Sequence, residues 1–285
     1  MTTKSLTKNH PLAGKKMMGA DMIVQILADE GVDTIFGYSG GAILPTYDAV
    51  FRFNEENKDS DGNQPMPLIV PANEQGAGFM ASGYARASGK VGVVMVTSGP
   101  GATNTVTPIR DCMADSIPIV VISGQVPTTA IGTDAFQEAP VSAIMGAVSK
   151  HIFLVTDPLL LESTIRSAFE LAKTGRPGPV VVDIPKDIQN WEGEFLGSGS
   201  LPLTGYRNRL ETVMNNNLND ELAKNFYKLL SKSKKPLIYA GGGVINADAS
   251  SQLRQFSETY KIPIVTTLMA LGASDTTKSL LLHML

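Results

Sequence analysis

Residues 91–104 read Val-Gly-Val-Val-Met-Val-Thr-Ser-Gly-Pro-Gly-Ala-Thr-Asn, an apolar run followed by a glycine-rich turn. A short apolar run bounded by turn residues is typical of a strand that is buried on both faces. The glycines that follow it, before a stretch of small residues, predict a turn that opens a helix. A buried strand that leads through a tight turn into a helix is the repeating unit of a parallel α/β sheet.

The same alternation of apolar runs and helical patterns extends to both sides of this stretch. We predict a doubly wound parallel sheet of the α/β class. Residues 54–67 are polar and predict a surface loop. The predicted strands are 32–37, 67–70, 91–97, 117–123 and 180–184, and the predicted helices are 17–31, 42–53, 76–88, 104–115 and 158–174.

The composition changes near residue 188, and this change indicates a domain boundary. Residues 189–219 are rich in Gly, Ser, Asn and Leu without a regular period, which predicts a linker. A helix at 220–231, a strand at 236–240, a helix at 249–259 and a strand at 262–267 predict a second, Rossmann-like α/β unit. The strand, helix and strand of this unit alone leave the edges and at least one face of the sheet uncovered, so we expect the unit to be incomplete. The predicted organisation is a flexible N-terminus (1–16), a first domain (17–188), the linker (189–219) and an incomplete second domain (220–285).

Composition also excludes several functional classes. The formal net charge of the 285 residues is −3 without a long basic run, which argues against nucleic acid or an anionic membrane as a partner. The single cysteine, Cys112, excludes an internal disulfide, and we expect it to be a buried core thiol. The three histidines are far apart, so no metal site is predicted. The polar N-terminus lacks the apolar core of a secretory signal, and we expect a cytoplasmic protein.

Three stretches hold candidate functional residues. Glu74 follows an apolar run and opens a helix, so it is either an acid that contacts free backbone amides at a helix N-terminus or a functional carboxylate. The Ser98–Asn104 turn could bind phosphate, but it lacks the Lys-Ser/Thr ending of a P-loop. The long loop at 124–138 is too elaborate for a simple connection, and long loops are often functional.

Together, Asn-Glu-Gln-Gly-Ala at 73–77, Ser-Gly-Pro-Gly-Ala-Thr-Asn at 98–104 and the loop at 124–138 resemble the pyrimidine-binding domain of thiamine diphosphate enzymes. The closest resemblance is to the large catalytic subunits of acetolactate synthase. It extends from residue 17 to residue 285 and covers the pyrimidine domain and the first part of an FAD-binding-like central domain.

The resemblance implies a role for each matching residue. Glu74 would hydrogen-bond N1′ of the aminopyrimidine and so promote deprotonation of the thiazolium C2, and Gln137 would hydrogen-bond a substrate oxygen as charge develops. The implied contacts to the pyrimidine side of the cofactor are Gly40, Gly41, Ser98, Gly99 and Asn104. The implied substrate channel, where inhibitory herbicides bind, is lined by Val126, Pro127, Ala130, Ala135, Phe136 and Lys186. The implied FAD contacts are Arg176, Gly241, Gly242, Gly243, Thr267, Leu268 and Met269. Without the resemblance, the glycines at 40–41 and 241–243 would predict only tight turns. Arg176 and Lys186 would then be surface charges.

The implied reaction is decarboxylation of pyruvate on thiamine diphosphate and condensation of the two-carbon unit with pyruvate or 2-oxobutyrate, in branched-chain amino acid biosynthesis. The implied cofactors are thiamine diphosphate, FAD and Mg²⁺, with the diphosphate and metal site expected in a domain beyond this chain, so that residues 1–285 alone would be poorly active. The implied partners are a second copy, in a homodimer or higher oligomer with the active site at the subunit interface, and a small regulatory subunit.

Three positions depart from the family pattern: Ser39 replaces a usual proline, and Asn73 and Phe79 replace common histidines. Two alternatives remain open. One is a sister enzyme such as pyruvate oxidase, glyoxylate carboligase or sulfoacetaldehyde acetyltransferase, and the other is a non-catalytic truncated partner of a full-length subunit.

Overall fold

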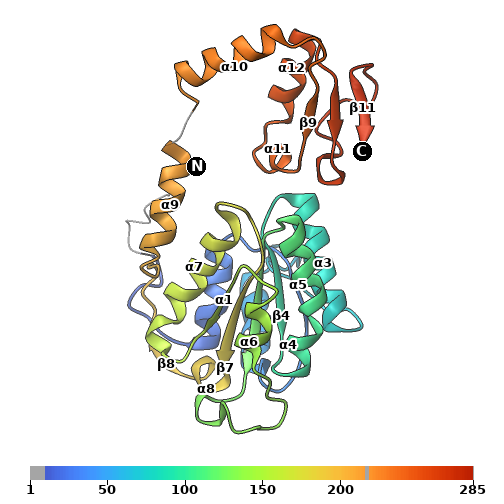
Figure 1. Cartoon of the computed structure of the whole chain (residues 1–285). Helices are drawn as coiled ribbons and strands as arrows, with labels where there is room; N and C mark the ends of the chain where they lie inside the picture. Colours follow the sequence, from blue (N-terminus) through green and yellow to red (C-terminus); the bar gives the residue numbers. More distant parts are fainter. Residues whose placement is uncertain (1–9, 216–217, 285) are drawn as a thin grey trace. The chain divides into compact units, whose positions relative to one another are not determined.

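The computed structural model describes residues 10–215 and 218–284, and the chain forms two compact units that divide between Leu210 and Glu211 (Figure 1). The first unit is built on a six-stranded sheet in which every neighbouring pair is parallel. This confirms the predicted α/β class with a parallel sheet. The strands lie in the order β3 (Leu68–Ile69), β2 (Ile35–Tyr38), β4 (Gly92–Val96), β5 (Ile119–Gln125), β7 (Val180–Pro185) and β6 (His151–Leu154).

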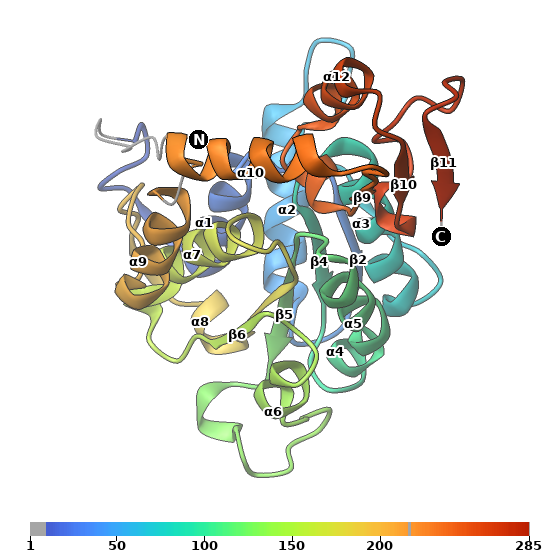
Figure 2. The same ribbon diagram turned by 45° about the horizontal axis from the view of Figure 1, so that its top comes forward.

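Helices cover both faces of this sheet (Figure 2). One face packs against α1 (Gly19–Asp29), α2 (Leu44–Asn57) and α7 (Leu161–Lys173), and the core there takes alternate strand residues such as Val93 and Met95. Val94 and Val96 between them are also buried, because the strand alternates its side chains between two covered faces. On the other face α3 (Glu74–Ser88) packs against α5 (Val106–Asp115), whose Cys112 is fully buried as predicted. Two shorter helices follow β4 and β5 in sequence: α4 (Pro100–Asn104) and α6 (Val141–Gly146).

The first helix begins two residues later than predicted, and part of the predicted linker forms a strand. Residues 17 and 18, expected in the helix, and residue 16, expected in the flexible N-terminus, form β1 (Lys16–Met18), which pairs antiparallel with β8 (Glu192–Glu194). This pairing joins segments far apart in sequence, so no local pattern reveals it. Helix α1 starts at Gly19, and this position must be a glycine because a Cβ there would lie 2.2 Å from the Ile188 carbonyl oxygen of α8 (Lys186–Gln189).

The segment 189–219 is structured over most of its described length. Phe195 is fully buried, and Leu203 and Tyr206 pack against the core of the first unit. The helix α9 (Thr204–Asn215) occupies residues that were expected to be a linker, and its first turns carry Tyr206. Composition misled here because a few apolar residues among many polar ones are enough to attach a segment to a neighbouring core.

The loop predicted at 54–67 is shorter than expected, because α2 runs on to Asn57. Asn54 is buried, and its side chain donates to the Met66 carbonyl oxygen (2.8 Å) and accepts from the Met66 amide (3.0 Å). These two bonds fold the ends of the loop together, so only its middle is a surface segment. Strand β6 and helix α6 were not predicted.

The second unit has a three-stranded parallel sheet in the order β11 (Leu281–Met284), β10 (Ile264–Thr266), β9 (Ile238–Ala240). Its helices are α10 (Asp220–Lys232), α11 (Gly243–Asn246) and α12 (Ser250–Tyr260). Its buried core is small and centres on Ala240, Ile264, Ala270 and Ala273. Among the described residues of the whole chain, no helix is both long and apolar enough to cross a membrane.

Candidate active site

The candidate site residues of the first unit follow the carboxyl ends of neighbouring parallel strands. The chain leaves β2 for β3 on one side and returns to β4 on the other, so the connections diverge between β2 and β4. In open parallel sheets this divergence point forms the ligand crevice. The turn at 39–43 follows β2, Glu74 follows β3, Ser98 follows β4 and the loop at 126–138 follows β5.

Glu74 is the first residue of α3 and has an exposed fraction of only 8%. Its neighbour Asn73 caps this helix, since the Asn73 side chain accepts a hydrogen bond from the Gly76 amide (2.8 Å). Glu74 Oε2 accepts instead from Nδ2 of Asn104 (2.9 Å), at the end of α4. Oε1 receives no hydrogen bond from the residues that the structure describes. The capping explanation therefore belongs to Asn73, and Glu74 presents a carboxylate oxygen that is free to meet a ligand.

Thr97 joins two of the predicted turns and was not predicted from the sequence. Its Oγ1 accepts a hydrogen bond from the Ala42 amide (3.2 Å). A Cβ at Gly40 would lie 2.4 Å from the Thr97 methyl carbon, and a Cβ at Gly101 would lie 2.7 Å from the same atom. Both glycines are therefore required for the turns after β2 and β4 to close around this threonine. A Cβ at Gly41 would meet nothing within 4 Å, so this position is open.

The loop after β5 contacts the turn after β4. Gly99 has φ +53°, and a Cβ there would lie 2.1 Å from the backbone oxygen of Gln137. At the base of the loop, a Cβ at Gly124 would lie 2.7 Å from the Ala42 carbonyl. The structure thus brings Glu74, Asn104, Ser98–Gly99, Gly40 and Gln137 to one end of the sheet through these shared neighbours.

Two further buried side chains support this region and gave no sequence signal. Gln189 is fully buried, and its Nε2 donates to the Ala42 carbonyl oxygen (2.7 Å) and to that of Ile184 (2.9 Å). The Tyr47 hydroxyl donates to the Met95 carbonyl oxygen (3.0 Å). Burial first, and then the nearby Glu74 carboxylate, raise the pKa of Tyr47 well above its usual value, so its phenol stays neutral.

Asp183 is a buried acid at the base of the same loop. It lies on β7 with an exposed fraction of 1%, and its Oδ2 accepts from Nε2 of Gln125 (2.8 Å). The Gln125 Oε1 in turn accepts from the Val126 amide (2.9 Å). Asp183 Oδ1 is buried without a hydrogen-bond partner among the described residues. Burial raises the pKa of Asp183 to about 7, although the hydrogen bond from Gln125 and the nearby Ser123 hydroxyl act in the opposite direction.

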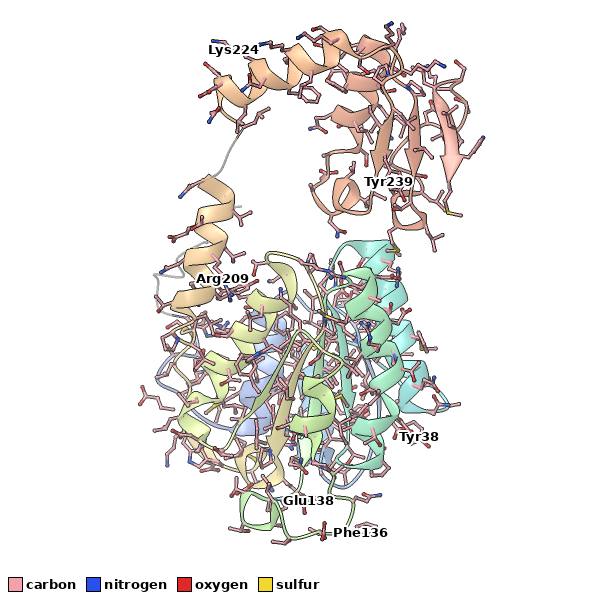
Figure 3. All side chains as sticks on the ribbon, in the orientation of Figure 1. Tyr38, Phe136, Glu138, Arg209, Lys224 and Tyr239 are labelled. Carbon is pink, nitrogen blue, oxygen red and sulfur yellow. The ribbon has the colours of Figure 1, made fainter. Side chains whose placement is uncertain are left out.

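The predicted channel residues differ in exposure. Val126 is buried, Ala130, Ala135 and Lys186 are half-buried, and Pro127 is exposed. Phe136 has an exposed fraction of 89% and lies at the outer edge of the loop, beyond Glu138 (Figure 3). A ring that is this exposed packs against little of the described chain, so it is available to a substrate or to another chain.

Arg176 has a structural role that its sequence context did not indicate. Its Nε donates to the Ser116 hydroxyl (2.8 Å), and its Nη2 donates to the carbonyl oxygens of Met113 (3.0 Å) and Ala114 (2.8 Å). The guanidinium therefore caps the last turn of α5, where carbonyl groups lack helical partners. Only Nη1 makes no hydrogen bond to the described part of the chain, so a flavin contact by Arg176 would have to use that nitrogen.

In the second unit, the two predicted flavin-binding segments lie side by side. A Cβ at Gly242 would lie 2.9 Å from Cβ of Met269, and the Thr267 amide donates to the Ala240 carbonyl oxygen (2.9 Å). Gly241 and Gly243 have open space where a Cβ would be, and the buried Thr266 Oγ1 has no partner among the described residues. A backbone lined by glycines with an unused buried hydroxyl fits the close approach of a ligand. Within residues 10–215 and 218–284, no three His, Cys, Asp or Glu side chains cluster as a metal site.

Two protein-family models match this chain. Residues 17–144 match the N-terminal TPP binding domain of thiamine pyrophosphate enzymes, and residues 223–285 match their central domain. The chain belongs to the thiamine pyrophosphate enzymes. The first match holds the turn after β2, Glu74, the turn after β4 and the β5 loop, so the four segments that meet in space all lie within it.

Three relatives that are named acetolactate synthases match most of this chain. The chain is 46% identical over 266 residues to the acetolactate synthase large subunit of Corynebacterium glutamicum, which covers 93% of this chain and 40% of the relative. It is 44% identical over 262 residues to the mitochondrial acetolactate synthase catalytic subunit of Saccharomyces cerevisiae, covering 91% of this chain and 36% of the relative. It is 42% identical over 273 residues to the chloroplastic enzyme of Arabidopsis thaliana, covering 94% and 38%. The chain thus spans about two fifths of the length of these relatives.

Proposed function

We propose that this chain supplies the pyrimidine-binding half of an acetolactate synthase active site, in an enzyme that forms 2-acetolactate or 2-aceto-2-hydroxybutyrate for branched-chain amino acid synthesis. The observation that carries the proposal is Glu74, a buried carboxylate whose Oε2 is engaged by Asn104 and whose Oε1 receives no bond from the described residues. The names of the relatives support the choice of reaction.

Each residue of the site has a definite task in this proposal. Glu74 offers Oε1 as the partner of the cofactor's pyrimidine nitrogen, and Asn104 fixes the carboxylate so that this oxygen faces the ligand. Gly40, Gly41, Ser98 and Gly99 let backbone approach the ring closely. Gln137, on the loop against Gly99, hydrogen-bonds a substrate oxygen as negative charge develops on it. Thiamine diphosphate, when bound, would supply a carbon acid whose deprotonated form is a nucleophile toward the carbonyl of a 2-oxo acid.

A second copy of the chain would complete the site. Large apolar side chains next to Glu74 are exposed: Phe79 (43%) and Met80 (45%) on α3, and Ile69 (42%) and Val70 (56%) at the end of β3. An apolar surface of this kind beside a candidate site supports a subunit interface. We expect Phe79→Asp to shift the sedimentation of the whole enzyme from dimer to monomer and to abolish turnover, and a dimer of normal activity would contradict this interface.

Further parts of the proposal concern the other cofactors and partners. FAD would bind the second unit at Gly241–Gly243 and Thr267–Met269, which their proximity supports. Mg²⁺ and the diphosphate would be held by another domain of the whole enzyme, a placement that the greater length of the relatives supports. The term large subunit in the name of the Corynebacterium relative supports a small regulatory partner. We propose a cytoplasmic location.

The proposed function is tested by product analysis. The whole enzyme that carries these residues is incubated with pyruvate, thiamine diphosphate and Mg²⁺, and the product is identified. Formation of 2-acetolactate supports the proposal, and a different product would indicate a sister enzyme. Residues 1–285 alone should be poorly active, because the diphosphate and metal provide most of the polar anchoring of the cofactor.

A further inference from the structure

The loop after β5 is held by carboxylates near both of its ends. At the first end, Asp187 of α8 accepts from the amide and the hydroxyl of Thr128 (3.0 Å and 2.5 Å). At the second end, Glu138 accepts from the amides of Gly132 and Ala135, the latter at 3.0 Å. Both oxygens of each carboxylate accept a hydrogen bond. Asp187 thereby joins Thr128 of the loop to α8, and Glu138 joins Gly132 and Ala135 to the end of the loop.

The loop needs such ties because its backbone is strained. Asp134 has φ +57° and Gln137 has φ +59°, and neither is a glycine. Residues other than glycine rarely adopt this left-handed backbone conformation unless surrounding contacts hold it. The backbone amides of Gly132 and Ala135 lower the pKa of Glu138, which shows that they stabilise its charged form. The two amides therefore stabilise the charged Glu138 carboxylate, and the carboxylate in turn holds the strained turn in place.

The tied loop determines where Gln137 lies. Its backbone oxygen sits against Gly99, where a Cβ would be 2.1 Å away, and Glu138 is the next residue. We propose that Glu138 and Asp187 are positioning residues of the active site: together they hold the β5 loop in the shape that places Gln137 beside the Ser98–Gly99 turn. This inference rests on the proposed function, but the shape of the loop can be measured independently of activity.

The first test is hydrogen–deuterium exchange of the 285-residue chain. Glu138→Gln replaces one accepting oxygen by an NH₂ group that cannot accept and removes the charge from the other, so at least one of the Gly132 and Ala135 amides should exchange about tenfold faster. Asp187→Asn likewise removes the charge that strengthens the bonds from Thr128, so the Thr128 amide should exchange faster. Asp134→Asn is the matched control, since it removes one charge from the same loop but its carboxylate makes no hydrogen bond to any described residue. Its loop amides should exchange as in the wild type, and unchanged β4 amides in every variant would show that the fold persists.

The second test is kinetic and uses the whole enzyme. Glu138→Gln and Asp187→Asn should raise KM for the 2-oxo acid about tenfold, because the substrate then has to order the loop. Wild-type exchange rates at both Gly132 and Ala135 in Glu138→Gln would show that Glu138 does not hold the β5 loop. Faster exchange without any change in KM or kcat would overturn the positioning role while acetolactate formation, and so the proposed function, still stood.

Discussion

The buried acid Asp183 makes the stability of the first unit depend on pH in a direction opposite to that of most carboxylates. Its ordinary pKa of 3.8 rises to about 7 in the folded protein because burial disfavours the charged form. Below the lower value both states carry the proton, and above the higher value neither does. Between them only the folded state holds it, so the free energy of unfolding falls as the pH rises.

The size of this effect follows from the same two values. The difference between 3.8 and about 7 corresponds to about 4 kcal/mol, at about 1.4 kcal/mol for each pH unit. Over the experimentally convenient range from about pH 5 to about pH 8, the Asp183 contribution should fall by about 2–3 kcal/mol. Asp183→Asn cannot ionise, so its free energy of unfolding should lack this slope.

Urea denaturation followed by tryptophan fluorescence measures the effect directly. Trp191 is the only tryptophan of the chain and packs against the core of the first unit, so its emission reports that unit. Asp61→Asn removes an exposed acid and is the matched control, which should keep the wild-type slope. If the wild type and Asp183→Asn give parallel curves of unfolding free energy against pH, the assignment of a raised pKa to Asp183 is wrong.

Other predictions concern single contacts. Gly40→Ala should lower the stability of the first unit by about 1–3 kcal/mol, because the added Cβ would lie 2.4 Å from Thr97. Gly41→Ala should be nearly neutral, because a Cβ there would meet nothing within 4 Å. Equal urea midpoints for the two variants would contradict the close approach at Gly40. Arg166 is 7% exposed and pairs with Asp29 (2.6 Å) and with the buried Glu162 (2.9 Å), so Arg166→Ala should cost about 3–5 kcal/mol by removing the positive charge that balances these two carboxylates. A change in thermal unfolding no larger than that of an exposed arginine, such as Arg209→Ala, would refute it.

Local patterns in the sequence are enough to predict the parallel sheet. Each buried strand is a short apolar run, and each is followed by a glycine, proline or serine turn, so these strands could be predicted without tertiary information, whereas β6 and α6 were not predicted. The divergence of connections beside β2 then brings the turns together by topology alone. The pairing of β1 with β8 and the attachment of α9 through Tyr206 depend on partners far away in sequence, and no local pattern predicts them.

The site could be predicted only as a set of segments. From the sequence, Glu74 could contact the free amides at the start of α3, and only the hydrogen bond from Gly76 to Asn73 shows that Asn73 caps this helix. In the same way, Arg176 looks like a surface charge until its bonds to the last turn of α5 are seen. Thr97, Tyr47, Gln189 and Asp183 carry no motif at all, because their roles come from the atoms that surround them in the fold. The catalytic and cofactor contacts assigned by resemblance stay predictions.

The exchange rate of the C2 hydrogen of bound thiamine diphosphate tests the central claim most directly. The whole enzyme is compared with Glu74→Gln, a variant of the same shape whose side chain cannot serve as the same acid–base partner of the pyrimidine. Cofactor binding is measured in parallel, so that loss of the cofactor is not mistaken for loss of chemistry. We predict that C2 exchange on the bound cofactor slows by about 100-fold or more, in line with the usual contribution of a positioned acid–base group. Exchange at the wild-type rate with the cofactor fully bound would contradict the role assigned to Glu74.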